Sequence, residues 1–340
     1  MSAVGAWYRS ANPAPAASVS LRRRIRDWVR GCLPEPDVRG RVMVMQSRTT
    51  LPSPSRTGMR AQYHGLFSEF HSVLGGVHYA REKGAAGLRI DFRSPLYVDA
   101  ARGPNWWLYF FERDQMTFGV DSINPVEIRL DARMTKYGRY GGFSDIVQGA
   151  TPYFYPMTHG LDRATLHGYV RDFATPTRAF QDRARQLAAG LFAPGAFIVG
   201  VHYRGTDAVH RWVGPFRHYR TRTVPFALYG DEVRRVLEHA APAAFQIFVA
   251  TDERAFLDFM RREFGGAVVA LDAPRAVDGT PVHLDAAVPP AAKGDSAVLD
   301  ALLLASTDYL VKGRSNLSDA SLVFNPGLPY SFHADIPIPS

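Results

Sequence analysis

The sequence is poor in cysteine and in long apolar runs. Its 340 residues include one cysteine, Cys32, which cannot form a disulfide within the chain. No apolar run comes near the roughly 18 residues that a membrane-spanning helix needs, and residues 1–20 lack the apolar core of a secretory signal. These absences argue against an oxidising compartment and against a membrane-spanning protein, so we expect a cytoplasmic location.

The motifs of the common nucleotide and metal sites are also missing. No Gly-x-Gly-x-x-Gly opens a βαβ unit, which argues against NAD and FAD, and no Gly-x4-Gly-Lys-Ser/Thr is present, which excludes a P-loop NTPase. No His-Glu-x-x-His, Cys-x-x-Cys or Asp-x-Asp supplies a set of metal ligands. We therefore expect neither a bound metal nor a resident cofactor.

Acidic residues are outnumbered, because 40 lysines and arginines stand against 32 acids, giving a net charge of +8 and a pI near 9.7. Nearly all the cations are arginine, whose planar guanidinium binds phosphate through two hydrogen bonds. An anionic partner is therefore expected. The densest basic run, from Arg22 to Arg30, indicates either peripheral contact with the inner face of a membrane or a solvated N-terminal helix. Nucleic-acid binding rests on the charge alone and is not expected.

The chain is long enough for more than one hydrophobic core. Hydrophobic residues make up 46% and charged residues 21%, as in ordinary soluble globular proteins, which excludes a largely disordered chain. At roughly 150 residues per domain, this length favours two domains. We place a basic, proline- and alanine-rich appendage at 1–40, an N-terminal domain with a helical linker at 41–193, and a C-terminal domain at 194–340.

Both halves alternate short apolar runs with amphipathic stretches. In the first half, a strand over 41–45, a helix over 67–83 and a strand over 87–92 form a βαβ unit, which implies a parallel sheet. Gly84 is placed as the C-terminal stop of that helix. The aromatic run at 105–111 is typical of a core.

The second half repeats this alternation more clearly. Its apolar runs predict parallel strands and its amphipathic stretches predict the helices between them, as in an open Rossmann-type sheet. The expected strands cover 197–201, 245–250, 267–271 and 309–311, and the expected helices cover 225–239, 254–264, 296–305 and a last one from 317 or 318. Two amphipathic helices, 161–173 and 178–192, join the halves. The predicted fold class is therefore α/β, with two Rossmann-like domains facing each other across a cleft.

Polar residues follow three of the predicted strands in the second half. Because ligands of open parallel sheets bind at the carboxyl ends of the strands, these residues are candidates for a site. Arg204, with His202 two positions earlier on the same face, suits the binding of a pyrophosphate leaving group. Alternatively, these two residues are structural and paired with acids. The three groups are His202, Arg204, Thr206 and Asp207; Thr251, Asp252 and Glu253; and Arg314, Ser315 and Asn316.

Helix capping is an equally open interpretation of two of these groups. Asp252 and Glu253 stand where a helix N-cap and a first-turn acid are expected. Ser315 and Asn316 can cap the last helix, but a helix N-terminus is also a phosphate site.

The segment Gly200-Val201-His202-Tyr203-Arg204-Gly205-Thr206-Asp207 resembles the His-x-Arg-x-Thr-Asp motif of GT-B fucosyltransferases, the family of the core α1,6 and rhizobial nodulation enzymes. Two further segments resemble that family's second and third motifs in the same order: Phe248-Val249-Ala250-Thr251-Asp252-Glu253, and the stretch from Ser296 to Ser315, in which Asp300 precedes Leu303-Leu304. The resemblance covers about 195–325, whereas the N-terminal half matches only in layout.

The resemblance implies roles for individual residues. Arg204 would hold the β-phosphate of the donor and support the departure of GDP, with His202 behind it. Asp252 and Glu253 would lie near the guanine or ribose, Asp300 would read the base, and Ser315 would bind the pyrophosphate. The donor-binding set expected in this way is His202, Thr206, Tyr229, Asp252, Glu253, Asp300, Arg314, Ser315 and Asn316. The family is inverting and needs no metal.

The chain departs from the family next to the first motif. Core fucosyltransferases carry a second arginine where this chain has Gly205. They also carry a lysine where it has Ala208, and a glutamate that acts as the catalytic base where it has Trp212. The group that takes the proton of the acceptor hydroxyl is therefore open. Beside Arg204, the candidates for a catalytic role are Asp207, His210 and Glu69.

We thus expect an inverting, metal-independent glycosyltransferase that transfers a sugar, with fucose from GDP-fucose favoured, to a hydroxyl of a glycan or glycoconjugate. Two alternatives share the fold. One is a transferase that uses another nucleotide sugar, and the other is an inactive relative that only binds nucleotide or glycan.

Overall fold

The computed structural model describes residues 37–47, 49–50, 62–63, 65–119, 127–131, 161–205, 224–276, 282, 285, 287–313 and 315–332. The described residues up to Arg178 form one compact unit, called here the N-terminal unit, and those from Ala179 form the C-terminal unit. Each unit has its own mainly parallel sheet, so the predicted α/β class with strand–helix layering in both halves is confirmed. The predicted domain boundary, between 193 and 194, follows the helix α7 (Arg178–Leu191).

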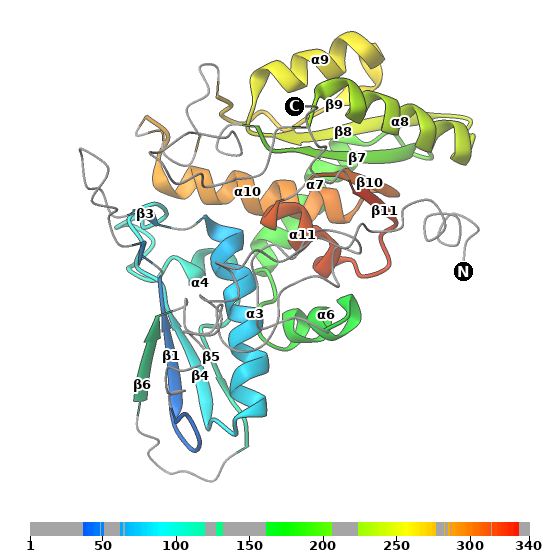
Figure 1. Cartoon of the computed structure of the whole chain (residues 1–340). Helices are drawn as coiled ribbons and strands as arrows, with labels where there is room; N and C mark the ends of the chain where they lie inside the picture. The colour runs from blue at the N-terminus through cyan, green and yellow to red at the C-terminus, as the bar shows by residue number, and fades with distance from the viewer. Residues whose placement is uncertain are drawn as a thin grey trace, which may run out of the picture. The chain divides into compact units, whose positions relative to one another are not determined.

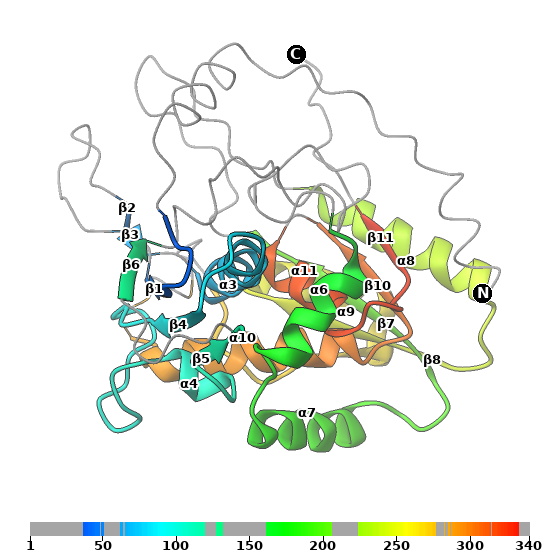
Figure 2. The same ribbon diagram turned by 90° about the horizontal axis from the view of Figure 1, so that it is seen from below.

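The N-terminal unit is built on a sheet with the strand order β5-β4-β1-β6. The central strand β1 (Val42–Gln46) pairs in parallel with β4 (Gly87–Asp91) and β6 (Glu127–Asp131), and β5 (Gln115–Thr117) pairs antiparallel with β4. The helix α3 (Leu66–Glu82) packs along β1 and β4, as Figures 1 and 2 show from two sides. The βαβ unit expected over 41–92 is confirmed.

The helix α3 ends where the sequence predicts. Gly84 follows it with φ of +66°, a left-handed conformation that glycine adopts without steric cost. Most of the helix is buried, so its position is fixed by packing. The turn at Gly84 then directs the chain into β4. The remaining described elements of this unit are β2 (Thr49–Thr50), β3 (Gln62–Tyr63), α4 (Trp107–Phe110) and α6 (Arg163–Asp172).

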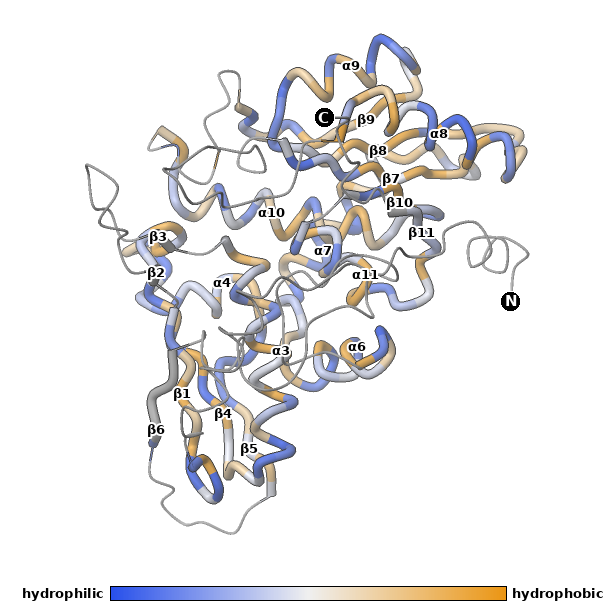
Figure 3. The backbone as a smooth tube through the Cα atoms, in the orientation of Figure 1, coloured by the Kyte–Doolittle hydropathy of each residue, from blue (hydrophilic) through white to orange (hydrophobic). Residues whose placement is uncertain are grey.

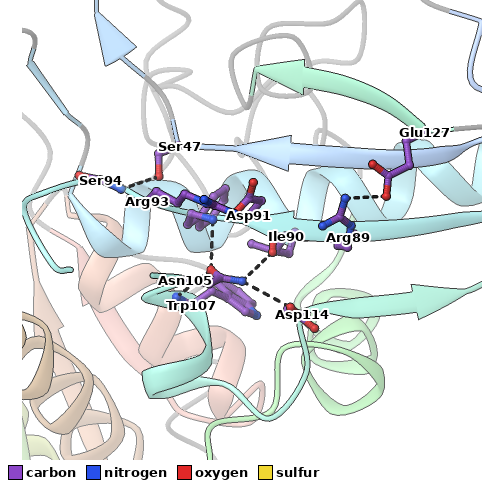
Figure 4. A network of polar contacts seen from close by, with 11 residues as sticks. Ser47, Arg89, Ile90, Asp91, Arg93, Ser94, Asn105, Trp107, Asp114 and Glu127 are labelled. Atoms are coloured by element: carbon purple, nitrogen blue, oxygen red, sulfur yellow. Dashed lines mark hydrogen bonds and ion pairs between the residues drawn. The ribbon is translucent and has the colours of Figure 1, made fainter. Parts of the chain in front are cut away.

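The aromatic run is core, as predicted. Trp106 and Trp107 have no exposed surface, and the ring of Trp107 stacks on Phe111 with centroids 4.0 Å apart. A polar residue fixes the run to the sheet: the amide of Asn105 donates to the Ile90 carbonyl at 2.8 Å and accepts from the backbone N–H of Phe92 at 3.1 Å (Figure 4). The carboxyl end of β4 is therefore held in place by a side-chain network rather than by packing alone.

The C-terminal unit carries a sheet in which all pairings are parallel, with the strand order β11-β10-β7-β8-β9. The order changes direction beside β7, and at such a switch point open sheets bind ligands. The strands are β7 (Phe197–Tyr203), β8 (Phe245–Thr251), β9 (Val268–Val269), β10 (Tyr309–Lys312) and β11 (Tyr330–Phe332), and the helices are α7, α8 (Phe226–Ala240), α9 (Arg254–Phe264), α10 (Pro290–Ala305) and α11 (Asn316–Phe324).

Helices cover both faces of this sheet (Figure 1). Val201 and Tyr203 of β7 and Val311 of β10 join residues of α8 and α9 in one core cluster. On the other face, Gly200 meets α10 so closely that a Cβ there would lie 2.7 Å from Thr307 Oγ1 and 3.1 Å from the Leu304 side chain. The strands are accordingly mainly apolar, whereas α9 alternates between apolar and polar residues (Figure 3).

Candidate functional site at the carboxyl ends of β7, β8 and β10

Strand pairing brings the three polar groups to one edge of the sheet. His202 at the end of β7 is in register with Lys312 of β10 and with Ala250 of β8, and Tyr203 is in register with Thr251. Because side chains alternate along a strand, His202 and Lys312 project from the face that α10 covers, opposite to Tyr203. The sequence motifs that follow β7, β8 and β10 are therefore neighbours in space.

His202 is a buried, neutral histidine. It is 5% exposed, and its Nδ1 has no hydrogen-bond partner within the described part of the chain. Burial, together with the charges of Arg204 and Lys312, lowers its pKa to about 3. At physiological pH the ring therefore offers one N–H donor and one acceptor nitrogen, and no charge.

Lys312 is the residue of this edge that the sequence analysis missed. It has no exposed surface, and its Nζ lies 2.5 Å from Oδ1 of Asp319 in the first turn of α11. The only available signal was a lysine directly after the apolar run Tyr309-Leu310-Val311, where a cation ordinarily faces solvent.

Asp252 joins the ends of two strands. Its Oδ1 accepts a hydrogen bond from the backbone N–H of Gly205 at 3.2 Å, and its backbone carbonyl accepts from Ala276 N–H at 2.8 Å. The carboxylate thus holds the backbone of the residue that follows Arg204. Arg204 itself is partly exposed at the same edge.

Glu253 lies against Gly205. A Cβ on residue 205 would be 1.6 Å from Oε2 of Glu253. Any residue other than glycine at position 205 would therefore force Glu253 to move. Burial raises the pKa of Glu253, and the neighbouring charge of Asp252 adds to the effect. Glu253 occupies the N-cap position of α9, but its side chain accepts no hydrogen bond from that helix. The capping interpretation, with Asp252 as the N-cap and Glu253 as an acid of the first turn, is therefore wrong for both residues.

Tyr229 comes from α8 and belongs mainly to the core. It is 1% exposed, and its ring packs edge-on against Tyr203 with centroids 5.3 Å apart. Its hydroxyl lies near the end of β10, where a Cβ on Gly313 would be 2.4 Å from it. Burial raises the pKa of Tyr229, so the hydroxyl stays protonated.

Asp300 lies on α10 near two charged groups of the same edge. Burial raises its pKa to about 7; Arg275 acts against this increase and Asp252 adds to it. Arg275 is held by the carbonyls of Leu271 at 2.6 Å and Ala273 at 3.1 Å. Asp300 is therefore close to half-protonated at neutral pH, which makes any hydrogen bond that it accepts dependent on pH.

Ser315 is the N-cap of α11. Its side chain accepts a hydrogen bond from the backbone N–H of Leu317 at 3.3 Å, so the capping interpretation is confirmed for this residue. Asn316 is the first residue of the helix. A role of either in donor binding stays a prediction.

The other predicted site residues do not belong to the described part of this edge. Glu69 is a buried residue of α3 in the N-terminal unit, with no exposed surface. Four candidates, Thr206, Asp207, His210 and Arg314, lie outside the described residues, as does the basic run from Arg22 to Arg30. Within the described ranges, no group of three or more histidine, cysteine or acidic residues is arranged to hold a metal ion. In the same part of the chain, no helix has the length and apolar character to cross a bilayer.

Solved structures of fucosyltransferases are similar to this chain. The NodZ alpha-1,6-fucosyltransferase soaked with GDP-fucose is 18% identical over 85% of this chain and 94% of that one, with a TM-score of 0.48. An Arabidopsis thaliana FUT1 variant in complex with GDP is 12% identical over 96% and 76%, with a TM-score of 0.46. POFUT1 without ligand is 10% identical over 88% and 99%, with a TM-score of 0.38.

No protein-family model matches the chain, and no curated protein matches it. The solved structures reported above are of fucosyltransferases, the class of enzyme that the sequence motifs resemble.

Proposed function

We propose that the protein is an inverting, metal-independent glycosyltransferase that uses a GDP-sugar, with GDP-fucose favoured, and transfers the sugar to a hydroxyl of a glycan or glycoconjugate. The observation that carries the proposal is the position of Arg204, a guanidinium at the carboxyl end of β7, two residues after a buried neutral histidine. The three-motif resemblance supplies the donor class.

Arg204 holds the β-phosphate and stabilises the charge that develops when the bond from C1 to the phosphate oxygen breaks. A guanidinium suits this task because it is always charged and forms paired hydrogen bonds to phosphate. His202 lies behind it and, being neutral, donates a hydrogen bond without adding charge. The N-terminus of α11, with Ser315 and Asn316, lies at the same edge and favours negative charge.

Asp300 reads the base in this proposal. As a carboxylate it accepts hydrogen bonds from the N–H groups on the Watson–Crick edge of guanine, which adenine does not offer in the same pattern. The acceptor oxygen forms its bond to C1 on the face opposite to the departing GDP, which inverts the configuration. No bound metal takes part, since Arg204 supplies the positive charge at the leaving group.

The first test is binding. Melting temperatures with GDP, GDP-fucose, GDP-mannose, UDP and UDP-glucose, each with and without EDTA, report which nucleotide the native state binds. Stabilisation by GDP and GDP-fucose regardless of EDTA supports the proposal. Preferential stabilisation by UDP or UDP-glucose would mean that the donor is a UDP-sugar and not a GDP-sugar. No binding of any of these nucleotides would contradict the proposal.

The second test separates a transferase from a binding protein. Arg204→Ala should lower the release of GDP from GDP-fucose by at least about a hundredfold, because the guanidinium acts on charge that appears in the transition state. An exposed arginine of α9 provides the matched control, Arg262→Ala, which should keep the activity. A binding protein instead shows no turnover in the wild type and only weaker binding in Arg204→Ala, an alternative that the replaced positions Ala208 and Trp212 favour.

A further inference from the structure

Among the residues that the structure describes, Glu253 has no hydrogen-bond or ion-pair partner for its carboxylate. Its backbone N–H donates to Thr251 Oγ1 at 3.1 Å, which fixes the main chain at this point. Its carboxylate makes no hydrogen bond or ion pair with any residue in the described part of the chain, and it does not cap α9. By contrast, the adjacent Asp252 is engaged by the backbone of Gly205.

The carboxylate of Glu253 lies very close to the backbone of Gly205. Oε2 of Glu253 lies where a Cβ of residue 205 would be, at 1.6 Å from it. Only glycine at 205 leaves that space empty. The glycine and the acid therefore form a matched pair, which brings a negative oxygen onto the backbone of the residue next to Arg204.

The environment also suits proton transfer. Burial and the charge of Asp252 both raise the pKa of Glu253. A base is most effective when its pKa approaches the working pH, so these two effects make the carboxylate a stronger base than an exposed glutamate. It remains partly exposed, so a hydroxyl can reach it. Glu69, the other described candidate for this role, has no exposed surface.

We propose that Glu253 is the catalytic base of this protein, placed beside Arg204 by Gly205; this inference rests on the proposed function. A carboxylate oxygen of Glu253 takes the proton of the attacking hydroxyl while the oxygen of that hydroxyl bonds to C1 of the sugar. The bond from C1 to the β-phosphate oxygen breaks at the same time, and its electron pair leaves on GDP. With water as the acceptor, the same step gives free fucose and GDP.

The acceptor need not be known to test this proposal. The hydrolysis of GDP-fucose, measured as the release of GDP, reports the step with water as the attacking group. Glu253→Gln keeps the size of the side chain and removes the base, so hydrolysis should fall by about 10²–10⁴-fold. Binding of GDP, measured by calorimetry, should stay within about threefold of the wild type or become tighter, because a negative charge near the phosphates has been removed.

Azide distinguishes a base from a residue that only positions the donor. Azide attacks C1 without losing a proton, so at high concentration it should restore donor cleavage in Glu253→Gln to a larger extent than it accelerates the wild type. The acid limb of the pH–rate profile should also disappear in the variant. The matched control is Glu263→Gln, a glutamate of α9 that pairs with Arg234, which should behave as the wild type in all three measurements.

The outcomes separate the two proposals. If the wild type neither binds GDP nor cleaves GDP-fucose, the proposed function fails. If the wild type does both and Glu253→Gln keeps its hydrolysis rate, or loses it without rescue by azide, Glu253 is not the base while the proposed function stands.

Discussion

The Nζ atom of Lys312 lies 2.5 Å from Oδ1 of Asp319, and Lys312 has no exposed surface. This ion pair connects the end of β10 to the first turn of α11. Ser315 and Asn316 lie between the two residues in sequence, so the pair fixes the start of α11 against the edge of the sheet. The connection matters because this helix N-terminus is part of the proposed donor site.

Breaking that pair should be costly. Lys312→Met leaves the carboxylate of Asp319 in a buried position without its cation, and we expect a loss of about 3–5 kcal/mol in stability. Adding Asp319→Leu removes the stranded charge and should recover most of that loss. Hydrogen exchange of the amides of β7 and β10 measures the stability of this unit directly.

An exposed pair gives the control for that experiment. Arg254→Met breaks the ion pair with Asp258 at the start of α9 and should cost under about 1 kcal/mol. If Lys312→Met costs no more than this control, the charge of Lys312 is not needed to compensate that of Asp319.

His202 should make the protein sensitive to acid. The ring is neutral in the folded state, with its pKa lowered to about 3 mainly by burial, whereas an unfolded histidine titrates near 6.5. Below pH 6.5 the unfolded chain therefore binds a proton that the folded chain does not, and stability falls as the pH is lowered. Between pH 7.5 and 5 this amounts to about 2 kcal/mol.

The variant His202→Gln should remove that part of the pH dependence. Because the substitution also changes packing, the quantity to compare is the change in unfolding free energy between pH 7.5 and 5. His239→Gln, at an exposed position near the end of α8, should leave the slope as in the wild type. An unchanged slope in His202→Gln would show that the ring is charged or open to solvent in the native state.

The strands β7, β8 and β10 could be predicted because parallel strands covered on both faces are mainly apolar, whereas the edge strand β11 was not predicted. The predicted runs 197–201, 245–250 and 309–311 match β7, β8 and β10 to within two residues. The helix expected at 296–305 begins earlier, at Pro290, because a proline at the first helical position has no N–H whose hydrogen bond could be lost.

The site could be predicted only as far as one strand end determines it. His202, Asp252 and Ser315 follow from the rule that ligands bind where parallel strands end. The ion pair of Lys312 with Asp319 and the contact of Glu253 with Gly205 each join two separate elements of the fold. A sequence pattern contains no information on how closely such side chains approach.

Asp300 should make donor binding dependent on pH. Its pKa is raised to about 7 by burial, and only the carboxylate accepts hydrogen bonds from guanine N–H groups. The affinity for GDP should therefore fall as the pH is lowered through about 7, approaching tenfold per unit below it. Calorimetry of GDP binding from pH 8.5 to 5.5 measures this.

Asp300→Asn should bind GDP more weakly at pH 8.5 and lose the dependence on pH in that range. Asp295→Asn, on the same helix, is the matched control and should retain it. A wild-type affinity that does not change across pH 7 would mean that Asp300 does not contact the base.

Gly205 and Glu253 should act as one unit. Gly205→Ala places a methyl group at the position of Oε2 of Glu253 and 2.8 Å from the Tyr203 ring, so the carboxylate must move away. The moving atom is the end of a flexible side chain, and we expect a loss of stability of only roughly 1–2 kcal/mol. Donor hydrolysis should nevertheless fall about as far as in Glu253→Gln, because the base has left its place.

The double variant decides whether the two losses have one cause. If the methyl group acts by displacing the base, Gly205→Ala combined with Glu253→Gln should hydrolyse the donor no more slowly than either single variant, because the second change removes nothing that the first has left. Multiplied losses would show that alanine at 205 disturbs Arg204 independently. Gly266→Ala, at a glycine after α9 with open space around its Cα, is the control for adding a methyl group and should keep the activity.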